Sequence, residues 1–150
     1  MSLIFDTHAH YDDEAFDADR ETLLASMPEH GVGLILDPGC DLGSSRRAVE
    51  LARTYPHVYA AVGWHPENCA PYTEDSLDAL RAWAREPKVV AIGEIGLDYY
   101  WEQNPPRELQ QKVLRDQLAL AQELDMPVIL HDREAHADSL AIVQEFPAVR

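Results

Sequence analysis

The chain has 150 residues, of which 46% are hydrophobic and 26% charged, values typical of a globular protein with one domain. Its formal net charge of −15 excludes a general basic surface for nucleic acid, so any phosphodiester substrate must be held locally. No apolar run approaches the roughly 18 residues of a membrane helix, no signal peptide precedes Asp6, and we expect a cytoplasmic protein without membrane contact.

Apolar runs of strand length alternate along the chain with amphipathic stretches of helical length. Strands are expected at 3–8, 32–37, 58–64, 89–96 and 127–131, and helices at 16–31, 41–56, 73–87, 105–127 and 133–147. Gly31 is expected to end the first helix, Asp41 or Ser44 to cap the second, and Thr73 to cap the third. This alternation predicts right-handed βαβ crossovers and a parallel sheet.

Reactive side chains follow the apolar runs. A doubly wound nucleotide-binding sheet would carry a glycine-rich loop after its first strand, but His-Ala-His stands there. In a (β/α)8 barrel, by contrast, reactive groups lie at the carboxyl ends of several strands. Here these groups are His8, His10, Asp37, His65, Glu94 and His131. We therefore predict an α/β protein with the fold of a (β/α)8 TIM barrel.

The length of the chain limits how much of a barrel it supplies. Eight βα units need about 250 residues, and residues 1–150 supply about the first five. We expect residues 1–150 to form a single domain, the N-terminal part of the barrel, with the remainder beyond residue 150. If the polypeptide ended at Arg150, we would expect exposed apolar surface, weak metal binding and no turnover, as in a catalytically incomplete fragment.

Two segments carry candidate metal ligands. Asp6, His8 and His10 alternate at the end of the first strand, so their side chains point to one side. Imidazoles and a carboxylate suit zinc and related divalent ions, the alternative being histidines of an exposed loop. Val90, Ile92 and Glu94 are likewise expected on one strand face, where a buried carboxylate needs a charge partner or a metal. The alternative for Glu94 is an exposed loop position.

The fifth apolar run adds a third group of candidates. His131 ends this run, and Arg133 follows on the same side if the strand continues. A guanidinium is suited to bidentate contact with phosphate. We expect His136 to be a surface residue, and we assign no role to His30 and His57, which precede strands and so lie at the opposite end of the barrel. Cys40 and Cys69 are expected to be free thiols.

Together, these segments resemble the TatD family of metal-dependent hydrolases within the amidohydrolase-like superfamily. The matching stretches are "FDTHAHYD", "VGWHPE", "AIGEIGLDYY" and "QLALAQELDMPVILHDREA". The resemblance implies a barrel that holds two divalent cations, Mg²⁺ above all, with Mn²⁺ or Zn²⁺ as alternatives. It implies that His8 and His10 bind the first cation, that Glu94 bridges both as the central catalytic ligand, and that His131 binds the second.

The resemblance also implies a histidine and an aspartate ligand beyond residue 150. It implies substrate-binding roles for His65 and Arg133, and a supporting role behind the ligands for Asp98.

The resemblance further implies that DNA is the substrate. We expect a deoxyribonuclease, a 3′–5′ exonuclease that hydrolyses phosphodiester bonds, and no stable protein partner. Paired cations lower the pKa of a bound water towards 7 and neutralise charge on the attacked group. The alternative for the same metal site is a D-aminoacyl-tRNA deacylase or another ester or amide hydrolase.

Overall fold

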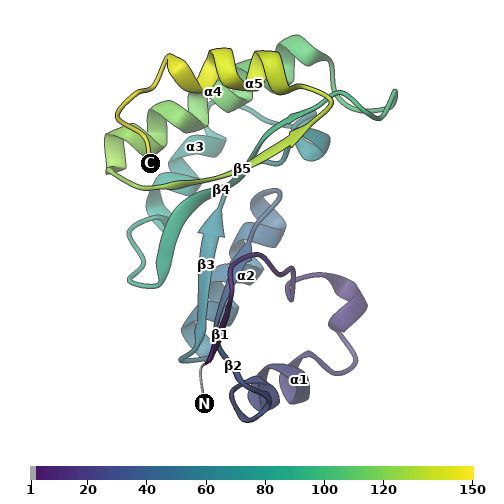
Figure 1. Ribbon diagram of the computed structural model, residues 1–150, viewed down its shortest axis with the longest axis vertical. Coiled ribbons are helices and arrows are strands. Elements are labelled where there is room, and N and C mark those ends of the chain that lie inside the picture. Colours follow the sequence, from purple (N-terminus) through teal and green to yellow (C-terminus); the bar gives the residue numbers. More distant parts are fainter. Residues whose placement is uncertain (1–2) are drawn as a thin grey trace.

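The core of the fold is one parallel sheet whose strands follow the order of the chain. The computed structural model describes residues 3–150 and orders the strands β1-β2-β3-β4-β5. Every neighbouring pair is parallel, and the sheet curls into a half-barrel (Figure 1). The strands are β1 Ile4–Asp6, β2 Val32–Pro38, β3 Val58–Val62, β4 Val89–Asp98 and β5 Val128–Arg133.

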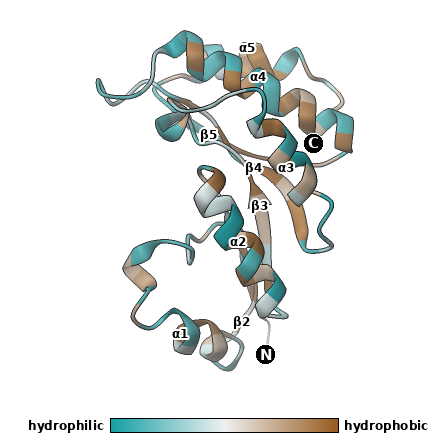
Figure 2. Cartoon of the chain, turned by 180° about the vertical axis from the view of Figure 1, so that it is seen from behind, coloured by the Kyte–Doolittle hydropathy of each residue, from teal (hydrophilic) through white to brown (hydrophobic). Residues whose placement is uncertain are grey.

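Helices follow the strands, as the alternation predicted. Seen from behind in Figure 2, α2 and α3 lie in front of β3 and β4. The α-helices are α1 Arg20–Ser26, α2 Leu42–Thr54, α3 Ser76–Trp83, α4 Arg107–Leu124 and α5 His136–Gln144, and the short 3₁₀ helices are η1 Glu14–Phe16, η2 Met27–His30 and η3 Pro66–Asn68. None of the helices within residues 3–150 combines the length and the hydropathy needed to cross a bilayer.

The main hydrophobic core lies between the sheet and these helices. Ile92, Ile95 and Leu97 of β4 belong to one buried cluster with Leu114 and Leu118 of α4, and none of these side chains is exposed. Burying a side chain of this size stabilises the fold by about 1.5–3 kcal/mol. The helices thus hold the sheet through its apolar residues, and the reactive side chains are left at the ends of the strands.

The ends of the helices differ from the predictions in two places. The helix expected at 16–31 is divided into η1, α1 and η2, with Pro28 in the first turn of η2, where its missing N–H costs nothing. Gly31 ends this segment with φ 89°, as predicted. Asp41 caps α2. Thr73 does not cap α3, because the helix begins at Ser76 and the Thr73 carbonyl accepts a hydrogen bond from the Ser76 amide.

Strand β4 corrects a further expectation. Its register shifts both against β3 and against β5, so its residues do not alternate regularly between two faces. Val90 packs against the cluster that contains Ala61, whereas Ile92 belongs to the core beneath the helices. The prediction that Val90, Ile92 and Glu94 share one face is therefore wrong.

Several large apolar side chains of the half-barrel remain exposed. Ile4 and Phe5 on the edge strand β1 are 62% and 48% exposed, and Leu130 on the edge strand β5 is 41% exposed. In a closed barrel such strands would have a neighbour on each side. Cys40 and Cys69 are free, as predicted.

Candidate metal centre

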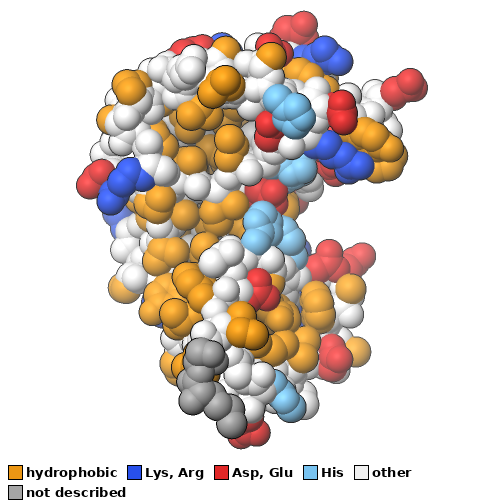
Figure 3. Space-filling view, in the orientation of Figure 1, with side chains coloured by type: hydrophobic (Ala, Val, Ile, Leu, Met, Phe, Trp, Pro, Cys, Tyr) orange, Lys and Arg blue, Asp and Glu red, His pale blue; other side chains and the backbone are white. Residues whose placement is uncertain are grey.

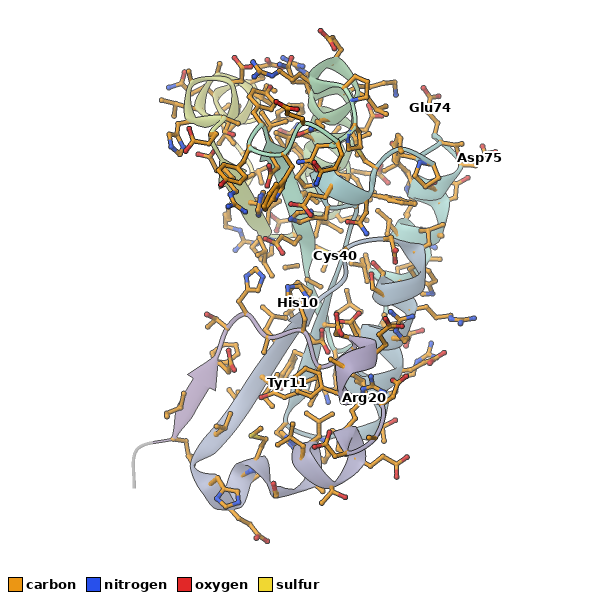
Figure 4. All side chains as sticks on the ribbon, turned by 90° about the vertical axis from the view of Figure 1, so that its right-hand side faces the viewer. His10, Tyr11, Arg20, Cys40, Glu74 and Asp75 are labelled. Atoms are coloured by element: carbon orange, nitrogen blue, oxygen red, sulfur yellow. The ribbon has the colours of Figure 1, made fainter. Side chains whose placement is uncertain are left out.

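Four histidines and one glutamate meet at the carboxyl ends of the strands. His8 and His10 follow β1, which ends at Asp6, and His65 follows β3. Glu94 lies in β4 and His131 in β5. Figure 4 shows His10 near Cys40, which follows β2 and lines the same cleft. The strands run parallel, so their carboxyl ends bring together side chains that are far apart in sequence.

The two oxygens of the Glu94 carboxylate face different imidazoles. Oε2 lies 3.1 Å from Nε2 of His8 and 3.6 Å from Nε2 of His10. Oε1 lies 3.2 Å from Nδ1 of His131 and 3.9 Å from Nε2 of His65. Within each group, His8–His10–Glu94 and His65–Glu94–His131, the nearest donor atoms lie within 4.8 Å of one another. Glu94 therefore connects two sets of donors, each of a size that suits one cation.

The surroundings also shift the pKa values of these groups in different directions. Burial alone would raise the pKa of Glu94, but the neighbouring imidazoles of His10 and His131 hold that pKa below its usual range. Asp12 and Glu94 raise the pKa of His10 to about 10. Burial lowers the pKa of His65 to about 4. Without a cation, the centre at neutral pH thus combines an ionised carboxylate, a protonated His10 and a neutral His65.

Asp98 contacts His131 at Nε2, the ring nitrogen that does not face Glu94. Its Oδ2 lies 2.9 Å from Nε2 of His131, and its side chain is fully buried. Its Oδ1 accepts hydrogen bonds from the Tyr100 amide and from Asn104 Nδ2. A carboxylate behind one ring nitrogen keeps the proton on that nitrogen, so the opposite nitrogen presents its lone pair. Nδ1 of His131 is therefore the atom available to a ligand beside Glu94.

Comparison with known proteins decides the family. The sequence profile described as "TatD related DNase" matches residues 5–150. The chain belongs to the TatD family. It is 40% identical over 143 residues to the uncharacterized metal-dependent hydrolase YabD of Bacillus subtilis, covering 95% of this chain and 56% of YabD. It is 39% identical over 140 residues to the 3′-5′ ssDNA/RNA exonuclease TatD of Cronobacter turicensis, covering 93% and 53%.

A solved TatD structure has the same fold. The crystal structure of YJJV, a TatD homologue from Escherichia coli, superposes with a TM-score of 0.87 at 38% identity, covering 95% of this chain and 56% of that one. The chain thus spans about half the length of the relatives it matches. The match confirms the predicted TIM-barrel fold class, and the five parallel strands of residues 3–150 form a curled half-barrel.

Two candidate residues from the sequence, Asp6 and Arg133, lie outside the donor groups around Glu94 within residues 3–150. Asp6 is not among the donor groups in residues 3–150, and its Oδ1 instead accepts a hydrogen bond from the His8 amide. Arg133 is exposed, and its guanidinium lies 3.9 Å from the centroid of the Tyr100 ring rather than on Glu94. His136 is a surface residue paired with Asp132, which agrees with its expected place outside the centre.

His10 also belongs to a third cluster of possible donors, together with the carboxyl groups of Asp12 and Asp37. Nδ1 of His10 is 3.8 Å from Asp12, and Asp37 lies beside them. Asp37 is fully buried, and within residues 3–150 neither of its oxygens has a hydrogen-bond partner. Burial and the neighbouring Asp12 raise the pKa of Asp37 to about 9. The sequence placed Asp37 at a strand end but did not indicate that it lies near His10 and Asp12.

Two buried glutamines of α4 were missed by sequence reasoning. Gln117 accepts a hydrogen bond from the Trp64 amide at 2.7 Å and donates one to the Trp64 carbonyl at 3.1 Å. Gln110 makes the same two contacts with Asp98, at 2.9 and 3.0 Å. These two glutamines fix the backbone beside His65 and behind His131. They stand seven residues apart on the apolar face of the helix, which was the available signal.

Proposed function

We propose that this TatD-family protein is a metal-dependent hydrolase that cleaves DNA phosphodiester bonds from the 3′ end. The supporting observation is the Glu94 carboxylate, whose two oxygens face two separate sets of imidazoles. His8, His10 and Glu94 would hold the first cation, and Glu94 and His131 would hold the second. The relative from Cronobacter turicensis, named a 3′-5′ ssDNA/RNA exonuclease, supports the choice of a nucleic acid substrate.

The residues present fit a pair of divalent cations. Three histidines and a bridging carboxylate are the ligand types of zinc and manganese sites, and magnesium binds where carboxylates and substrate phosphates supply oxygen. Asp12 and Glu94 stabilise the protonated form of His10, and this ring would have to lose a proton to bind a cation, so cation binding would release protons. We propose Mg²⁺ as the cation, with Mn²⁺ and Zn²⁺ as the alternatives.

Residues next to the histidines orient the imidazole rings toward the centre. Two bound cations supply an activated water and neutralise charge on the phosphate. Asp98 holds the proton on Nε2 of His131 and thereby aims Nδ1 at the centre. The Glu67 amide donates a hydrogen bond to Nδ1 of His65, so the neutral ring carries its proton on Nε2. That N–H faces the centre and is placed to donate to a phosphate oxygen.

The test is hydrolysis of a 5′-labelled single-stranded oligonucleotide by the protein at its full encoded length. We expect stepwise shortening from the 3′ end with Mg²⁺ or Mn²⁺ and none with chelator. Glu94→Gln should reduce the rate beyond the 10–100-fold that loss of a supporting residue costs. Glu108→Gln, the same chemical change at an exposed position of α4, is the matched control and should hydrolyse like the parent.

Two results would contradict the proposal. One is hydrolysis that survives complete removal of divalent cations. The other is release of the amino acid from D-aminoacyl-tRNA under conditions that leave DNA intact, which would make the protein an ester hydrolase on the same site.

A further inference from the structure

Two aromatic side chains and one arginine form an exposed group beside the metal centre. The Tyr100 and Trp101 rings lie 4.6 Å apart at an interplanar angle of 89°, and the residues are 50% and 42% exposed. The guanidinium of Arg133 lies 3.9 Å from the Tyr100 centroid and 5.2 Å from the Trp101 centroid. We call these three residues the aromatic platform. Figure 3 shows hydrophobic and basic side chains side by side on the upper lobe, next to the hollow that contains histidines.

The aromatic platform is anchored to the centre through Asp98. The Tyr100 amide donates to Oδ1 of Asp98, and Asn104 Nδ2 donates to both the carbonyl and Oδ1 of Asp98. The Asn104 amide in turn donates to the Trp101 carbonyl at 3.2 Å. Asp98 is also the residue that orients His131. The loop that carries the rings is therefore fixed relative to a proposed metal ligand.

Arg133 adds an unpaired positive charge at this point. It stands two residues after His131 on β5, about 7 Å along the strand. Within residues 3–150 its guanidinium makes no hydrogen bond or ion pair, and only the aromatic rings contact it as a cation. Its N–H groups therefore remain free for an anion. In a protein of net charge −15, such a local cation is what a polyanionic substrate requires.

The combination of exposed aromatic faces and a free guanidinium matches the chemistry of one nucleotide. A base offers a flat aromatic face for stacking, and its phosphate offers oxygens to the guanidinium. Resting on the proposed function, we propose that Tyr100, Trp101 and Arg133 bind an unpaired nucleotide next to the scissile phosphate. Stacking of this kind needs a base free of its complementary strand and tolerates any base. The aromatic platform thus selects single-stranded ends with little preference for sequence.

The test compares two oligonucleotides with the full-length protein. One carries an ordinary 3′-terminal nucleotide, and the other carries an abasic nucleotide there, with the same phosphates. We expect kcat/KM for the base-bearing strand to exceed that for the abasic strand by about 5- to 150-fold, the range for one stacked base. Trp101→Ala should remove most of that ratio, whereas Trp101→Phe should retain it.

A second pair of variants examines the charge. Arg133→Ala should raise KM on both oligonucleotides more than it lowers kcat, because both keep their phosphates. Arg46→Ala removes an exposed arginine paired within α2 and is the matched control, with KM unchanged. Oligonucleotide binding without divalent cations should quench tryptophan fluorescence in the parent protein and much less in Trp101→Phe.

The outcomes separate this proposal from the proposed function. Hydrolysis of DNA with the same base-to-abasic ratio in the parent and Trp101→Ala would overturn the aromatic platform and leave the nuclease intact. Fluorescence quenching by an oligonucleotide that is never hydrolysed would support the aromatic platform and contradict the nuclease. A large loss of thermal stability in Trp101→Ala, with equal losses on both substrates, would show that the ring packs against the rest of the protein and would overturn the binding role.

Discussion

The hydrogen bonds of the buried Gln117 side chain allow the loss of stability in a Gln117→Leu variant to be predicted. Its side chain is fully buried and satisfies both the amide and the carbonyl of Trp64, the residue before His65. Gln117→Leu has similar volume but leaves two backbone groups without partners. Each orphaned buried group costs about 1–3 kcal/mol, and the leucine recovers part of this by apolar burial. We expect a net destabilisation of about 2–4 kcal/mol.

Thermal unfolding of the full-length protein measures this effect. One kcal/mol shifts Tm by about 2–4 °C for a chain of 150–250 residues, so Gln117→Leu should melt roughly 4–16 °C below the parent. Gln122→Leu is the matched control, because Gln122 is exposed on the same helix. A surface change of this kind should stay within about 0.5 kcal/mol of the parent.

Melting of the two variants within a degree or two of each other would contradict this prediction. That result would mean that the segment around Trp64 does not depend on α4. Hydrolytic activity gives a second readout, since Gln117→Leu should also loosen His65, whereas Gln122→Leu should not.

Three further predictions follow from single contacts. Gly96→Ala should prevent stable folding, because φ at Gly96 is 151° and a Cβ there would collide with the carbonyl of His131 in β5. Gly43→Ala in α2 should be tolerated and is the control. Soluble yield and Tm measure both effects. Asp98→Asn should weaken Mn²⁺ binding about 10–100-fold by calorimetry, and a change below threefold would contradict its role behind His131. Arg46→Ala removes one exposed ion pair, with Glu50, and should leave the urea midpoint unchanged, whereas a clear shift would show that this pair contributes to stability.

The sequence predicted the architecture because its signals are local. Apolar runs and helical periodicities depend on neighbours a few residues apart, and they placed all five strands and the order of the reactive side chains. The sequence-based predictions were wrong where a local irregularity of the backbone interrupted the periodic pattern of a helix or strand. Pro28 divides the first helix, and the register shifts of β4 place Val90 and Ile92 in different clusters.

The candidate centre was predictable in its members but not in its contacts. Parallel strands imply that His8, His10, Glu94 and His131 share one edge, so their meeting follows from topology. That Glu94 turns one oxygen to each set of imidazoles depends on the curl of the sheet and on the irregularity of β4. Neither can be read from alternation.

The sequence by itself determined the family, the parallel α/β order and the candidate ligands, because short motifs and periodicity carry that information. Only the tertiary structure decided that Gln117 holds Trp64, that Asp37 lies buried beside His10, and that Arg133 rests on two aromatic rings. These contacts join separate elements. They are set by how the helices and loops pack on a curved sheet, which no local pattern encodes.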